Sequence, residues 1–147
     1  MLPPKDTNAT EGESATFYCQ AEGDPQPDYI WFRAGGDPLQ TGEKYEIVIP
    51  DETNPTAKPS LTIKNLLKTD SADYTCQAEN AAGIEQAGGF LNVFIPPVMN
   101  PQNNETKRLN NMVELECFTR RGEEDTWLRW RRGDKWLTEG KQVGIDT

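Results

Sequence analysis

Cysteine is the residue type in this 147-residue sequence whose spacing suggests a specific chemistry. Trp31 follows Cys19 by 12 residues, and Tyr74 precedes Cys76 by two. Two thiols can be oxidised to a disulfide, and aromatic rings at these spacings can pack around the bridge. We therefore expect Cys19 and Cys76 to form a structural cross-link, with Trp31 and Tyr74 in the surrounding core.

Catalytic chemistry has little support in the composition. The sequence contains no histidine, which removes the commonest general base near neutral pH and the commonest metal ligand. It has no nucleophile–base pair, no phosphate-binding loop and no cluster with metal-ligand spacing. Asp70 is a carboxylate next to a turn, and we expect it to accept hydrogen bonds from turn amides or to pair with a base such as Lys44. We expect no enzyme activity, catalytic residue, metal or cofactor.

Short β-strands must position the cysteines and aromatic residues. Ala15, Phe17 and Cys19 alternate with polar neighbours, which is the pattern of a half-buried strand. Comparable runs, with turn signals between them, lie at 14–21, 28–34, 44–50, 60–65, 73–80 and 84–95, after an edge segment at 3–10. No segment has a convincing helical period, so the sequence predicts an all-β fold.

Cys, Trp and Tyr-x-Cys on about seven short strands are the signature of an immunoglobulin-like β-sandwich. In that fold Cys19 and Cys76 lie on opposing sheets, and the Tyr74 hydroxyl reaches back to upstream backbone. The bridge closes a loop of 57 positions. On the chain-entropy model a loop of that length stabilises the domain by about 4 kcal/mol, and the bridge requires an oxidising compartment. We expect residues 1–95 to form one complete domain.

Residues 96–147 begin a second copy of the same pattern. Residues 111–117 alternate like a strand that ends at Cys117, and Trp130 follows 13 residues later. Leu128 shares a face with Trp130, so Trp130 fits the core position better than Trp127. No second Tyr-x-Cys follows. We therefore expect a truncated second domain in which Cys117 is unpaired.

The sequence resembles tandem immunoglobulin domains of the I-set kind and, more closely, the neural cell adhesion molecule and fasciclin II family. The motifs that carry the resemblance are TNATEGES, AEGDPQP, EKYEI, SLTIKNLLKTDSADYTCQAENAAG, LNVFIPPV and VELEC. They match the third domain and the start of the fourth. The resemblance implies a glycosylated cell-surface receptor that mediates homophilic adhesion and axon guidance in the developing nervous system. Ala72 departs from the family pattern, where many relatives have glycine, and the second domain is incomplete.

The net charge of −9 is unevenly distributed. Residues 1–95 hold 6 basic and 15 acidic side chains, whereas residues 96–147 hold 9 of each. An acidic surface disfavours nucleic acid as a partner. The basic cluster of the second module comprises Arg120, Arg121, Arg129, Arg131, Arg132 and Lys135. A solvated strand face is the favoured interpretation, because Glu123, Glu124 and Asp125 interrupt the cluster. The alternatives are a heparan sulfate site and an antiparallel homophilic contact with the acidic first domain.

Other candidate sites lie on the predicted surface. Asn8 and Asn104 each begin an N-glycosylation sequon. Ile30, Phe32 and Phe90 are expected on the sheet face opposite the core, either as a binding face or as ordinary scattered apolar residues. The tripeptide 132–134 spells Arg-Gly-Asp, which integrins read in some proteins. A basic strand end followed by a Gly-Asp turn is the favoured interpretation of this tripeptide.

Two locations suit this sequence. The favoured one is the extracellular part of a plasma-membrane adhesion receptor, which binds a copy of itself on an apposed cell. No run of 18 apolar residues occurs in the sequence. We therefore expect any secretion signal and membrane attachment to lie outside these residues. The alternative is an intracellular, muscle-type I-set array with a structural role, in which the cysteines would stay reduced.

Overall fold

The computed structural model describes residues 1–99, 112, 114–122 and 127–137. The chain divides into two compact units, unit 1 (Met1–Ile95) and unit 2 (Pro96–Thr147). In the described part of the chain, no helix has the length and apolar character needed to cross a membrane.

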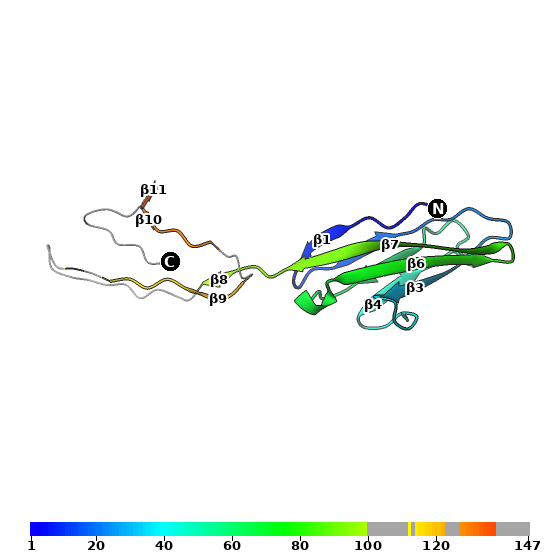
Figure 1. Cartoon of the computed structure of the whole chain (residues 1–147), viewed down its shortest axis with the longest axis horizontal. Coiled ribbons are helices and arrows are strands. Elements are labelled where there is room, and N and C mark those ends of the chain that lie inside the picture. The colour runs from blue at the N-terminus through cyan, green and yellow to red at the C-terminus, as the bar shows by residue number, and fades with distance from the viewer. Residues whose placement is uncertain (100–111, 113, 123–126, 138–147) are drawn as a thin grey trace. The chain divides into compact units, whose positions relative to one another are not determined.

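Unit 1 is a sandwich of two β-sheets (Figure 1). Its strands are β1 (Thr7–Thr10), β2 (Ala15–Tyr18), β3 (Asp28–Arg33), β4 (Tyr45–Val48), β5 (Ser60–Ile63), β6 (Ala72–Asn80) and β7 (Gly83–Phe94). One sheet has the order β1-β7-β6-β3 and the other has the order β2-β5-β4. β1 pairs with β7 in parallel, and the remaining pairs of unit 1 are antiparallel. The all-β sandwich predicted from the sequence is confirmed.

The first residues of the chain change sheets at a proline pair. Leu2 forms an isolated bridge with Gln20, next to β2, whereas β1 pairs with β7 in the other sheet. Pro3 and Pro4 lie between these contacts and have no N–H to donate to either ladder. The chain therefore lies at the edge of one sheet at Leu2 and at the edge of the other sheet at Thr7–Thr10, within the edge segment predicted at 3–10.

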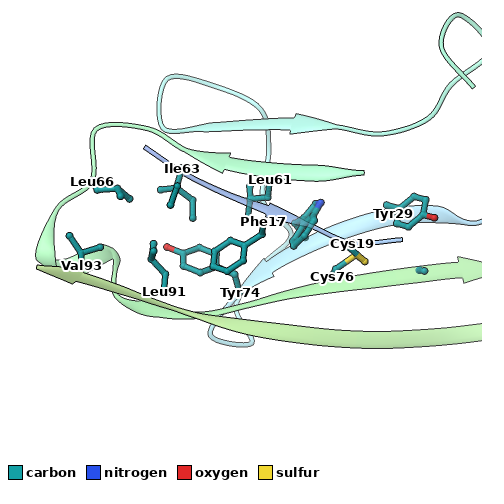
Figure 2. Close-up of a cluster of buried hydrophobic side chains, with 13 residues drawn as sticks. Phe17, Cys19, Tyr29, Leu61, Ile63, Leu66, Tyr74, Cys76, Leu91 and Val93 are labelled. Carbon is teal, nitrogen blue, oxygen red and sulfur yellow. A yellow bond between two sulfur atoms is a disulfide. The ribbon is translucent and has the colours of Figure 1, made fainter. Parts of the chain in front are cut away.

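The core lies between the two sheets and is drawn in Figure 2. Inward-facing residues of β2, β3, β5, β6 and β7 are buried, because alternate side chains point to one face of a sheet. The Phe17 and Tyr74 rings stack at its centre, with centroids 5.5 Å apart. The buried hydrophobic residues are Ala15, Phe17, Cys19, Tyr29, Trp31, Leu61, Ile63, Leu66, Tyr74, Cys76, Ala78, Leu91 and Val93. Period-two alternation predicts all of them except Leu66, which lies in a loop after β5.

Unit 2 contains two short antiparallel pairs. β8 (Val98–Met99) pairs with β9 (Thr119–Arg121), and β10 (Arg131–Arg132) pairs with β11 (Lys135–Trp136). The predicted turn at Gly133–Asp134 connects β10 to β11, and Gly133 has a φ of 59°, which glycine adopts without strain.

Two predictions for unit 2 are wrong in the part that the structure describes. Residues 112 and 114–117 lie in no strand, and Trp130 is half-buried instead of being a core residue. None of the described side chains of unit 2 is buried. Alternation produces a stable strand only when a paired strand and a second layer cover its apolar face, and the described residues provide neither at these positions.

Candidate protein-binding surfaces

A disulfide joins the two sheets of unit 1. Cys19 follows β2 and Cys76 lies in β6, and their sulfur atoms are bonded, with the Cα atoms 6.4 Å apart. Trp31 on β3 is directly opposite Cys76 in the strand register and is 1% exposed. Figure 2 places the bridge inside the hydrophobic core. The cysteines and Trp31 therefore stiffen the scaffold and are not available as a binding site.

Asp70 and Tyr74 form a hydrogen-bonded corner where the chain enters β6. The Tyr74 hydroxyl donates to the Asp70 carbonyl oxygen at 2.9 Å. Asp70 Oδ2 accepts from the Leu67 N–H at 2.8 Å and lies 2.5 Å from Lys44 Nζ. Burial raises the pKa of the Tyr74 phenol above its ordinary value. Both partners expected for Asp70, a turn amide and Lys44, are present, so this carboxylate is structural.

Ile30, Phe32 and Phe90 lie on the outer face of the β1-β7-β6-β3 sheet. Ile30 and Phe32 are half-buried, and the Phe90 side chain is 42% exposed. They do not form one continuous patch, because Phe90 is on β7 and β6 runs between it and β3. Across the sheet, Phe32 is in register with Thr75 and then with Gly88, which has no side chain. The outer face is consequently a shallow surface with apolar residues on both sides of a polar middle strand.

Acidic side chains gather at the end of unit 1 that holds the β6–β7 turn. Asp28 on β3 and Glu79 on β6 are directly opposite each other and both are exposed. Asn80 Nδ2 donates to the Pro25 carbonyl oxygen at 2.8 Å and so holds the β2–β3 loop against this turn. That loop carries Glu22 and Asp24, which are also exposed. We call Glu22, Asp24, Asp28 and Glu79 the acidic end. Among the residues described, no three His, Cys, Asp or Glu side chains group as metal ligands.

The sequence reasoning found the negative charge of residues 1–95 but not the acidic end. Two contacts create it, the Asp28–Glu79 register and the Asn80–Pro25 hydrogen bond. Neither contact has a local sequence signal. Only the position of Asp28 at the start of a predicted strand, in an acidic stretch with Glu22 and Asp24, could have pointed to it.

The β10–β11 hairpin of unit 2 combines basic and aromatic side chains. The Arg129 guanidinium lies 4.3 Å from the Trp136 ring centroid, and that of Arg131 lies 5.9 Å from it. Arg132 and Lys135 are in register on the two strands, and all four basic residues are exposed. Arg120 and Arg121 belong to β9, which pairs with β8, so two of the six predicted basic residues lie outside this hairpin.

The other predicted sites lie in different places. Asn8 is exposed on edge strand β1, opposite Asn92. Asn104 is outside the described residues. Cys117 is half-buried and is a free cysteine in the described part of the chain. Arg132, Gly133 and Asp134 form the exposed tip of the β10–β11 hairpin.

Comparison with curated proteins finds relatives of about 30% identity that are much longer than this chain. The chain is 33% identical over 151 aligned residues to human neural cell adhesion molecule 1, an alignment that covers 95% of this chain and 17% of that protein. It is 32% identical to human peroxidasin homolog, over 90% of this chain and 9% of that protein. It is 31% identical to zebrafish (Danio rerio) contactin-5, over 94% of this chain and 12% of that protein. The chain therefore spans less than a fifth of the length of each of these relatives.

Solved structures with the same fold include domains of titin. The complex of titin M10 with the obscurin-like 1 Ig domain matches at a TM-score of 0.56 and 29% identity, covering 65% of this chain and 92% of that one. The titin I-band fragment I67–I69 matches at a TM-score of 0.66 and 23% identity, covering 95% of this chain and 48% of that one, which shows the fold alone. The family model of the immunoglobulin I-set domain matches residues 1–93. With its two-sheet topology, inter-sheet disulfide and tyrosine corner, the chain belongs to the immunoglobulin I-set family and resembles proteins of the neural cell adhesion molecule type.

Proposed function

We propose that this chain is an extracellular protein-binding part of a cell-surface adhesion protein and that its partner is a second copy of the same protein. The observation that carries the proposal is the buried Cys19–Cys76 disulfide. Such a bridge persists in oxidising compartments and is rare in the cytosol. The similarity to a protein named for neural cell adhesion supports a role of the same kind in the nervous system. We propose that this role includes axon guidance.

The surface of unit 1 is consistent with a secreted glycoprotein. Asn8 is exposed within an Asn-Ala-Thr sequon on an edge strand, so a glycan at this position has room to project into solvent. A glycan there would also cover the free edge of β1, which could otherwise pair with another strand. Asn104 is the second proposed acceptor.

The proposed mechanism is surface complementarity without a reaction. The most suggestive carboxylate, Asp70, is already bound by Lys44 and by the Leu67 amide. We propose two binding surfaces, the outer sheet face with Ile30, Phe32 and Phe90, and the hairpin with Arg129, Arg131 and Arg132. An integrin contact through residues 132–134 and a heparan sulfate contact through the hairpin are secondary candidates.

An intracellular structural role in a muscle-type array is the second candidate function. The similarity to the complex of titin M10 with obscurin-like 1 favours it. The two functions differ in the state of the cysteines, because an intracellular array in a reducing cytosol would contain Cys19 and Cys76 as thiols.

The test is expression of the chain through the secretory pathway of a eukaryotic cell. Mass spectrometry is expected to find the Cys19–Cys76 bridge and a glycan on Asn8, and sedimentation velocity is expected to find self-association. Phe90→Ser should weaken association, whereas Tyr18→Ser, an exposed aromatic on the other sheet, should not. Reduced cysteines in the secreted chain, together with a monomer at every concentration tested, would overturn the proposal.

A further inference from the structure

The β10–β11 hairpin presents positive charge in a fixed arrangement. Arg129, Arg131, Arg132 and Lys135 are exposed, and Asp134 is the one acidic residue among residues 127–137. The Trp136 ring holds two of the guanidinium groups through cation–π contacts. A guanidinium that already lies against a ring has less conformational freedom to lose when it binds, which favours a contact at Arg129 and Arg131. No carboxylate of the described residues forms an ion pair with these four cations.

The composition of the hairpin is typical of a protein interface centre. Trp and Arg are the residue types over-represented among interface residues that carry most of the binding energy. Trp136 is 49% exposed, so part of its ring remains in contact with solvent beside the two guanidinium groups. Burying that surface against a partner would add an apolar contribution to the electrostatic one.

The acidic end of unit 1 has the opposite charge and an internal repulsion. Asp28 and Glu79 are directly opposite on neighbouring antiparallel strands. Like charges at directly opposite positions of a β-sheet are destabilising. Glu22 and Asp24 add two further negative charges on the loop that Asn80 holds nearby. A cationic partner would relieve this repulsion, and a neutral or acidic one would not.

We propose that the β10–β11 hairpin of one copy binds the acidic end of unit 1 of a second copy. The inference rests on the homophilic function proposed above and names the two surfaces that meet. Charge complementarity selects a second copy as the partner, because residues 1–95 carry all of the net charge of −9. A sulfated polysaccharide would also bind the cations of the hairpin, but it would leave the acidic end unused.

A charge-swap experiment on the full chain tests both surfaces together. The hairpin variant is Arg132→Glu with Lys135→Glu, which leaves the Arg129–Trp136 contact intact. The acidic-end variant is Asp28→Lys with Glu79→Lys. The matched control for the hairpin variant is Lys5→Glu with Lys58→Glu, which makes the same charge change as that variant at exposed positions of unit 1. Circular dichroism and thermal unfolding establish that each variant is folded before its self-association is measured by sedimentation velocity.

Each surface variant is expected to self-associate at least about tenfold more weakly than the natural chain, while the control is not weakened. An equimolar mixture of the two surface variants should recover the association, since the substituted positions of the two variants again carry opposite charges in the mixed pair. Association of the natural chain should also weaken when NaCl is raised from about 0.05 M to about 0.5 M.

Three results would overturn the inference. Self-association that survives in both surface variants would show that other surfaces carry it. A mixture that fails to recover binding would show that the two surfaces do not meet. If the hairpin variant loses heparin binding but keeps its self-association, the partner of the hairpin is a polysaccharide. A natural chain that never self-associates would overturn the homophilic function itself and is distinguishable from these results.

Discussion

Asp70 illustrates at the level of a single residue how geometry decides the role of a carboxylate. Its side chain is bound by the Lys44 ammonium and by the Leu67 amide, and its carbonyl oxygen accepts from Tyr74. The residue is 5% exposed. A buried carboxylate persists when it is paired and hydrogen-bonded in this way. Asp70 therefore ties the chain before β4, the turn after β5 and strand β6 into one corner.

Tyr74→Phe is expected to lower the free energy of unfolding by about 1 kcal/mol near neutral pH, because the hydrogen bond to the Asp70 carbonyl is lost. The pH dependence should change as well. Burial raises the pKa of the Tyr74 phenol above its ordinary value of 10.0. The unfolded chain then releases this proton before the folded chain does, so stability is fully present below about pH 10 and falls as the pH rises beyond that value.

Urea unfolding at a series of alkaline pH values measures both effects of Tyr74→Phe. The stability of the natural chain should fall more steeply above about pH 10 than that of the variant. Tyr18→Phe is the control, since the Tyr18 side chain is 59% exposed. Parallel stability curves for the natural chain and Tyr74→Phe would contradict the prediction.

At the level of elements, the strands of unit 1 could be predicted because the alternation of apolar and polar residues along them indicates which side chains are buried. A side chain on every second position of β2, β3, β5 and β6 enters the core, and the loop between β2 and β3 contains Gly and Pro. The strand predicted at 111–117 has the same alternation but is absent from the described residues there. The alternation of apolar and polar residues indicates which face can be buried, whereas a stable strand also needs a neighbouring strand with which to pair.

The candidate surfaces were less predictable than the strands. The exposed sequon at Asn8 and the basic residues of the hairpin are visible in the sequence because each is local. The acidic end is not, because it depends on the register between β3 and β6 and on a loop contact made 55 residues apart along the chain. The stacking of Arg129 and Arg131 on Trp136 likewise requires the hairpin to form first.

Strand β7 gives a prediction at this scale, because it passes close to the backbone that leads into β1. A Cβ atom added at Gly89 would lie 3.0 Å from the Lys5 carbonyl oxygen and 3.2 Å from Phe17 Cε1. Gly89→Ala should therefore destabilise unit 1 by about 1–3 kcal/mol, since backbone and a core ring cannot easily move away. Gly42→Ala is the matched control, because nothing lies within 4 Å of its added Cβ. Equal midpoints of urea unfolding for the two variants would rule out a close approach at Gly89.

For the molecule as a whole, one covalent bond links fold and function. The Cys19–Cys76 disulfide connects the β2-β5-β4 sheet to the β1-β7-β6-β3 sheet. The same bridge is the main support for the proposed extracellular location, because a chain that depended on it would be less stable in a reducing compartment. Stability and location are therefore coupled, and one measurement addresses both.

Reduction of the disulfide is expected to lower the free energy of unfolding by about 4 kcal/mol, because a bridge between positions 57 residues apart restricts the unfolded chain. Guanidinium unfolding with and without dithiothreitol measures the loss. The variant Cys19→Ala with Cys76→Ala should match or exceed it, since the missing sulfur atoms also leave space in the core. Cys117→Ala should unfold like the natural chain in both conditions, because Cys117 forms no disulfide in the described part of the chain.

If oxidised and reduced chains unfold at the same guanidinium concentration, the bridge does not stabilise the fold. The sandwich would then suit a reducing compartment equally well, and the intracellular alternative would gain support.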